Sequence, residues 1–182
     1  MKVKRIIETE VTKFEVGDQI KVGKYTATAM KQDGDNMIFC FDQYLDKPYT
    51  HENLLEKLND DLLNPDSLIP ISLLSQLEHV DGYLFRVPYA GEMFNETEEL
   101  QYILGHYKAD KDGEFLEVWP AMKDGKNRIA IRKGDPYEWG WLMNETIMSA
   151  ACFAFVGTDG VANCDIASDS LGVRPVFQIA NK

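Results

Sequence analysis

The chain has 182 residues, of which 45% are hydrophobic, and a formal net charge of −11 at pH 7. This length and hydrophobic content suffice for one substantial core, so we predict a single domain over residues 1–182. The charge argues against ordinary binding to a nucleic-acid backbone, which depends on Lys and Arg, and it favours a basic surface as partner.

The first third of the chain is predicted to be mainly β-structure. Residues 3–16 mix charges with β-branched side chains and predict an amino-terminal strand or arm before the turn at Gly17-Asp18. Alternation over residues 20–29 predicts a strand, and the polar residues 33–36 predict a turn. The continuous apolar run at residues 37–41 then predicts a second, more deeply buried strand.

Helical patterns follow. Leucines at positions 54, 55, 58 and 62 fall on one helical face after a capping segment at residues 50–53, and Pro65 ends this helix. Ser72 begins a second short helix, which ends before the turn at residues 81–82. Residues 83–88 predict a strand, and residues 89–105 predict a third helix with its glutamates on the outer face.

Short strands separated by turns are predicted from residue 108 onward. Turns at residues 110–113 and 124–125 precede strands at residues 115–120 and 127–132. A Trp-rich strand at residues 139–142 and an apolar strand at residues 153–156 lead to the Asp159-Gly160 turn, since Asp-Gly favours a hairpin. A last strand covers residues 172–177, with the sequence Gly-Val-Arg-Pro-Val-Phe.

The order of these last four segments resembles the end of a domain family of unknown function found in bacteria and their phages. That family is related to the formylglycine-generating (sulfatase-modifying) branch of the C-type-lectin-like fold. The resemblance implies an α+β domain with a twisted antiparallel sheet, two or three short helices, and the amino- and carboxy-terminal strands in one sheet. It also implies structural roles for Trp141, Gly160, Gly172, Arg174 and Pro175. The chain departs from the family where Met143-Asn144 follows Leu142, because Arg-Ser-Pro is usual there.

Catalytic and metal-binding patterns are weak in this sequence. The three histidines are far apart, and neither a zinc-ligand spacing nor a phosphate-binding loop occurs, so we expect no metal and no cofactor. An odd set of three cysteines, Cys40, Cys152 and Cys164, without CxxC spacing fits a reducing cytosol. Active relatives use carboxy-terminal cysteines to bind copper, so Cys152 and Cys164 leave a degenerate copper-dependent oxidase as one alternative.

We therefore predict a non-enzymatic binding protein in the cytoplasm, without a membrane span because no sufficiently long apolar run occurs. Residues 42–117 carry 17 acidic against five basic residues. The specific hypothesis is an inhibitor encoded by a phage or mobile element, of the anti-CRISPR type, that docks on the basic channel of a nuclease such as Cas9. The expected contacts are four glutamates of one predicted helix, with a tyrosine beside them as anchor: Glu92, Glu96, Glu98, Glu99 and Tyr102.

Two further expectations concern other surfaces. A short basic run predicts weak, salt-sensitive contact with nucleic acid through five residues: Lys123, Lys126, Arg128, Arg132 and Lys133. A carbohydrate- or protein-binding adhesin-like module is the other alternative, and it requires an exposed aromatic platform such as Trp139.

Overall fold

The computed structural model describes residues 13–67, 69–94, 98–132, 134 and 138–181, apart from the side chain of Glu98. It is a mixed α+β structure built mostly from antiparallel sheets. Its contacts form two compact units, which are described separately below. Unit 1 comprises Met1–Gln43, Leu55–Arg86 and Pro175–Lys182, and unit 2 comprises Tyr44–Leu54 and Val87–Arg174.

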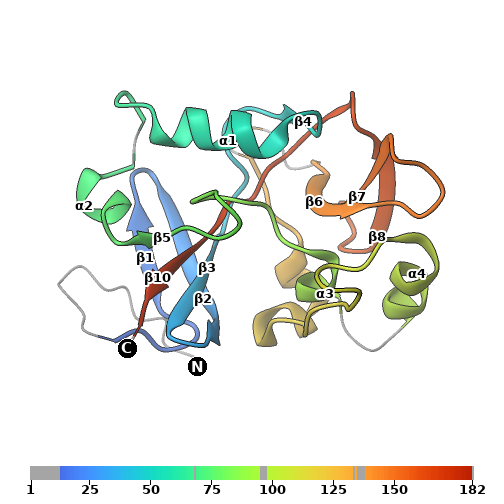
Figure 1. Cartoon of the computed structure of the whole chain (residues 1–182), viewed down its shortest axis with the longest axis horizontal. Helices are drawn as coiled ribbons and strands as arrows, with labels where there is room; N and C mark the ends of the chain where they lie inside the picture. Colours follow the sequence, from blue (N-terminus) through green and yellow to red (C-terminus); the bar gives the residue numbers. More distant parts are fainter. Residues whose placement is uncertain (1–12, 68, 95–97, 133, 135–137, 182) are drawn as a thin grey trace. The chain divides into compact units, whose positions relative to one another are not determined.

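Unit 1 is organised around a five-stranded antiparallel sheet. The strand order is β1 (Gln19–Val22), β2 (Tyr25–Asp33), β3 (Asn36–Phe41), β10 (Val176–Ala180) and β5 (Leu77–Glu78). Figure 1 shows β10, coloured red, next to β3, although the two strands come from opposite ends of the chain. The prediction that the strands around Ile20 and Val176 share one sheet is therefore confirmed.

A hairpin turn divides the strand predicted over residues 20–29. Gly23 has a φ of 64°, a conformation that glycine adopts at little cost, and β1 and β2 pair on either side of it. The predicted turn and apolar strand that follow are present as the β2–β3 connection and β3. On β3, the Phe39 ring stacks on Phe177 of β10 with centroids 5.3 Å apart, which places the core of unit 1 on this part of the sheet.

The first predicted helix is α1 (Leu54–Leu63), with Leu58 and Leu62 buried on the predicted face. The second is a single turn, α2 (Ile71–Leu74). Residues 83–88 form only isolated bridges instead of the predicted strand. Asn59 of α1 accounts for part of this difference, because its amide exchanges hydrogen bonds of 2.8 and 2.9 Å with the backbone of Phe85.

Unit 2 contains two antiparallel sheets and several short helices. The larger sheet has the order β6 (Gly140–Glu145), β7 (Cys152–Val156) and β8 (Ala162–Ile166), and the smaller one pairs β4 (Tyr49–Thr50) with β9 (Ser170–Leu171). The predicted Trp-rich strand, apolar strand and Asp-Gly turn are all present, and Gly160 has a φ of 80° in that turn.

Three predicted elements of unit 2 are wrong. The helix expected over residues 89–105 is two helices, α3 (Ala90–Met93) and α4 (Glu98–His106), with residues 95–97 outside the described part. The strand expected at residues 115–120 is absent, and that expected at 127–132 begins inside a 3-10 helix. These segments hold η1 (Pro120–Lys123) and η2 (Gly125–Arg128), because Pro120 opens one turn and Asp124 caps the next. No helix of the described residues is long and apolar enough to cross a membrane.

Candidate binding surfaces

Glu92, predicted to lie on an exposed acidic surface, is 2% exposed, so that prediction is wrong. Its carboxylate accepts a 2.9 Å hydrogen bond from the Tyr89 backbone N–H and so caps α3. Asp110 lies nearby and accepts hydrogen bonds from Gly91 N–H, at 3.0 Å, and from the Asn144 amide, at 2.6 Å. Burial, together with the charge of Glu92, raises the pKa of Asp110. These buried carboxylates organise the interior of unit 2.

The other predicted acidic contacts are not displayed as one surface. Glu96 and the side chain of Glu98 lie outside the described part of the chain. Glu99 is half-buried and pairs with Arg128, with Oε1 and Nη1 3.2 Å apart. The partner-binding role of these residues stays a prediction, and Tyr102, like Glu99, is half-buried.

The predicted basic patch is also divided. Arg128 is 4% exposed, and its Nε donates to the Met122 carbonyl at 2.9 Å, so its expected contact with nucleic acid is wrong. Arg132 pairs with the buried Glu138 at 3.1 Å, and Lys133 lies outside the described residues. Lys123 and Lys126 are exposed, so two of the five expected cations are available to a ligand.

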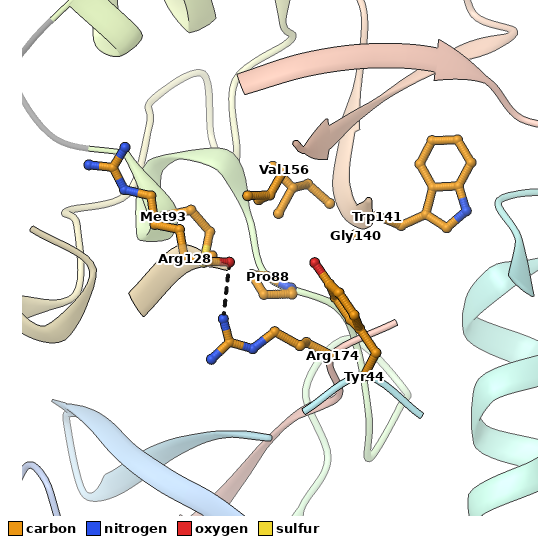
Figure 2. Close-up of a pocket in the computed structure, with 9 residues that line it drawn as sticks. Tyr44, Pro88, Met93, Arg128, Gly140, Trp141, Val156 and Arg174 are labelled. Atoms are coloured by element: carbon orange, nitrogen blue, oxygen red, sulfur yellow. Dashed lines mark hydrogen bonds between the residues drawn. The ribbon is translucent and has the colours of Figure 1, made fainter. Parts of the chain in front are cut away.

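Figure 2 shows a small cavity of unit 2 whose lining includes Tyr44, Arg128 and Arg174. The Arg174 guanidinium donates to the Asn127 and Arg128 carbonyls at 3.1 and 3.4 Å. The cavity offers about 10 Å³ to the centre of a water molecule, which is room for about one water and too little for an organic ligand. We therefore interpret this place as part of the unit's framework.

Close backbone approaches fix the same framework. A Cβ on Gly172 would lie 2.8 Å from Tyr44 Cγ, and one on Gly160 would lie 2.7 Å from the Gly125 carbonyl oxygen. The Trp141 indole is buried and donates to the Tyr49 carbonyl at 2.7 Å. Pro175 belongs to unit 1, where its carbonyl accepts a 2.9 Å hydrogen bond from Phe41 N–H.

One surface of unit 2 combines exposed aliphatic residues with the half-buried Tyr102, drawn from three elements, and we call it the α4 surface. Figure 1 shows α4 beside β8, with the β6–β7 sheet adjoining them. Met148 is 86% exposed, and Ile147 and Ile166 are each about half exposed. The α4 surface consists of Tyr102 on α4, Ile147 and Met148 in the β6–β7 turn, and Ile166 at the end of β8, whereas Leu104 lies on the opposite flank of α4 from Tyr102.

Hydrogen bonds and ring contacts hold the α4 surface together. Ile147 N–H donates to the His106 carbonyl at 2.8 Å, which fixes the β6–β7 turn against α4. Tyr102 stacks on His106, with centroids 4.1 Å apart, and meets Tyr107 edge-on at 5.8 Å. Desolvation and the Cys164 thiol raise the pKa of Tyr102, so this ring carries a neutral hydroxyl at pH 7. The surface is therefore apolar and pre-ordered.

A second accessible surface lies on the face of the β6–β7–β8 sheet that Trp139 joins, and we call it the Trp139 face. Trp139 is 43% exposed and stacks on the buried Phe155 at 4.8 Å. Phe155 pairs with Asn163 and Phe153 with Asp165, so these side chains share a face. The Trp139 face consists of Trp139, Phe153, Phe155, Asn163 and Asp165, of which Phe155 is buried and Phe153 is stacked on the His51 ring with centroids 3.6 Å apart.

The edge of the larger sheet is protected against strand addition. The pattern of hydrogen bonds turns the backbone groups of Cys164 and Ile166 away from β7. Both N–H groups are bonded by the preceding side chain, Cys164 N–H to Asn163 Oδ1 and Ile166 N–H to Asp165 Oδ1, each at 2.8 Å. A partner therefore meets side chains at β8 instead of adding a strand to it.

Cys152 and Cys164, the cysteines of the oxidase alternative, lie on neighbouring strands but are not directly opposite. Cys152 pairs with Ile166 and Cys164 pairs with Ala154, which places the two thiols on a diagonal, and both are free. Within the described residues, His, Cys, Asp and Glu form no group of three or more suited to a metal ion.

Comparisons with family models, with curated proteins and with solved structures found no match. The functional argument therefore rests on the two surfaces. Sequence reasoning named Tyr102 and Trp139 but missed Ile147, Met148 and Ile166. The sequence signal for two of them was the pair of large apolar residues Ile147 and Met148 between two strands, because a turn at such a place is normally polar.

Proposed function

We propose that the chain is a non-enzymatic binding protein that docks on another protein through the α4 surface. The observation that carries the proposal is the group of large apolar side chains left in solvent there, above all Met148 at 86% exposure. Exposed apolar side chains gathered from separate elements are typical of an interaction site, whereas single ones are ordinary.

The composition of the α4 surface favours a protein as its ligand. Ile147 and Ile166 offer aliphatic contact but no hydrogen bonds, and a sugar needs polar partners for its hydroxyl groups. Met148 is flexible and polarisable, so it adapts to an apolar partner surface. Tyr102 adds an amphipathic ring whose position is fixed by His106, which suits an anchor residue.

The proposal has a narrower form in which the partner is a nuclease of the Cas9 type, inhibited by a protein from a phage or mobile element. It is supported by the net charge of −11, which attracts a basic nucleic-acid channel. Cleavage of target DNA by a purified, guide-loaded Cas9-type nuclease tests it directly. We expect cleavage to fall as the chain is added, and unchanged cleavage at saturating concentration would remove this target.

We also propose that the fold is C-type-lectin-like. The support is the order of β6, β7, the Asp159-Gly160 turn, β8 and the closing segment, together with β1 and β10 in one sheet. The relationship to the formylglycine-generating branch is part of this proposal. A crystal structure tests it, and strands β1 and β10 found in different sheets would contradict it.

The binding proposal is tested by substitution of Met148, with Ile71 as a matched control. Ile71 lies on α2 in unit 1 and is 83% exposed, so Ile71→Asp introduces the same change at a similarly exposed apolar residue. A partner is first captured from a host lysate, identified and purified, and its Kd is measured by calorimetry.

Met148→Asp is expected to weaken binding at least tenfold, since a charge then replaces an apolar contact in a desolvated interface. Ile71→Asp is expected to leave Kd within about twofold. Equal Kd values for both variants and the unsubstituted chain would show that the partner binds elsewhere.

A further inference from the structure

Met148 differs from the other described methionines of the chain in its contact with solvent. The chain has seven methionines, of which Met1 lies outside the described residues. Met148 is 86% exposed, and Met143 on β6 is half-buried. The others are each no more than 2% exposed: Met30, Met37, Met93 and Met122. A reagent dissolved in water therefore reaches the thioether of Met148 much more readily than those of the buried methionines.

The thioether of methionine reacts with a peroxide in a two-electron step. One peroxide oxygen is transferred to Sδ, the O–O bond breaks, and hydrogen peroxide is reduced to water while the thioether is oxidised to the sulfoxide. Methionine sulfoxide reductases, one for each sulfoxide epimer, reverse the step, and a dithiol that becomes a disulfide supplies the two electrons. Oxidation of methionine to this level is therefore reversible.

The β6–β7 turn is held by groups other than the Met148 side chain. Thr146 Oγ1 donates to the Ser149 carbonyl at 2.9 Å, and Ile147 N–H donates to the His106 carbonyl at 2.8 Å. Because the Met148 side chain extends into solvent, an oxygen on Sδ adds no atom to the interior of the fold. The sulfoxide is therefore expected to leave the turn intact, and Tm within about 2 °C.

We infer that Met148 is a site of reversible oxidation by peroxide and that its sulfoxide weakens docking through the α4 surface. The second half of this inference rests on the proposed function of that surface. Oxidation turns a flexible apolar side chain into a polar one. Burial of the sulfoxide oxygen between Ile147, Ile166 and an apolar partner surface carries a desolvation cost that the thioether does not have.

The site of oxidation is tested without a partner. The full chain is exposed to hydrogen peroxide, the reaction is stopped with catalase at a series of times, and each methionine peptide is quantified by mass spectrometry. Met148 is expected to be oxidised at least about tenfold faster than the buried methionines, with Met143 between them. Oxidation of Met148 at the rate of the buried methionines would overturn the inference.

Cysteine oxidation is separated from methionine oxidation by its chemistry. Cys152 and Cys164 are half-buried and can also react with peroxide. Dithiothreitol returns cysteine sulfenic acids and disulfides to thiols, whereas methionine sulfoxide requires the reductases. The chain is therefore freed of peroxide and treated with dithiothreitol before binding is measured.

The consequence for docking is measured with the purified partner of the Met148→Asp experiment. The Kd of the oxidised chain is expected to rise about fivefold to tenfold and to recover after treatment with both reductases. Met148→Leu removes the thioether, so peroxide is expected to change the Kd of this variant less than about twofold. Met143→Leu is the matched control, and it is expected to keep the full rise on oxidation.

Two results would overturn the effect on docking: an unchanged Kd in a chain whose Met148 is fully converted to the sulfoxide, or an undiminished rise in Met148→Leu. Failure of the proposed function is a different result, because it appears in the absence of oxidant as a Met148→Asp variant that binds the partner as tightly as the unsubstituted chain.

Discussion

Replacement of Arg128 by alanine tests whether this residue supports the fold or contacts a ligand. Its guanidinium is buried, donates to the Met122 carbonyl at 2.9 Å and the Gly160 carbonyl at 3.4 Å, and pairs with Glu99 at 3.2 Å. Charge-assisted hydrogen bonds contribute about 1.5 to 3 kcal/mol each, the longer one less. Glu99 is partly exposed, so its pair adds less than about 1 kcal/mol.

Arg128→Ala is therefore expected to lower the free energy of unfolding by about 3 kcal/mol, because the Met122 and Gly160 carbonyls are left without their donor. For a chain of this size, the loss corresponds to a fall in Tm of roughly 6–12 °C by calorimetry. Arg128→Lys keeps the positive charge but loses the planar guanidinium, so its Tm should lie between that of Arg128→Ala and that of the unsubstituted chain. The control Lys126→Ala removes an exposed cation from η2 and should shift Tm by less than about 2 °C. An Arg128→Ala protein that melts within 2 °C of the unsubstituted chain would refute the structural role.

Three further outcomes are expected. Gly160→Ala should lower the free energy of unfolding by about 2 kcal/mol in urea titrations, because the φ of Gly160 is 80° and the new Cβ meets a carbonyl oxygen. The control Gly34→Ala also has a positive φ but free space around the Cβ, so it should lower the free energy of unfolding by about half as much. Asp110→Ala leaves three N–H donors without their acceptor and should cost about 3 kcal/mol, and a loss below 1 kcal/mol would contradict the network. Burial lowers the pKa of His51 below its ordinary 6.5, so the unfolded chain binds the proton more readily and stability falls as pH drops below 6.5. His51→Phe should flatten this part of the stability profile, and the exposed His79→Phe should not.

The parts of the fold that follow from local pattern were predictable. Alternating and continuous apolar runs located β2, β3, β6 and β7, the leucine spacing located α1, and Asp159-Gly160 located a turn. That β1 and β10 share one sheet was predicted from a family resemblance, because strands this far apart in sequence leave no local signal, whereas the pairing of β10 with β3 was not predicted.

Burial of charged residues was the main failure of prediction. Glu92 follows the outer face of a continuous helical pattern, but its carboxylate caps α3, and this helix ends at the next residue, Met93. Arg128 belongs to a basic run, but its side chain is buried and pairs with Glu99, which is distant in sequence. A sequence pattern gives the net charge of a segment but does not show which of its side chains have partners elsewhere in the fold. The same limit applies to Met148, because sequence alone does not show that an apolar residue stays in solvent.

Hydrogen–deuterium exchange of the chain, free and bound to its purified partner, tests the central claim most directly. The proposal predicts slower exchange on binding in α4 and in the β6–β7 turn, because a docked partner excludes water from their backbone amides. Unit 1 amides, including those of α2 around Ile71, are expected to be unaffected. Protection confined to unit 1, with α4 and the segment around Met148 unchanged in the complex, would contradict the account.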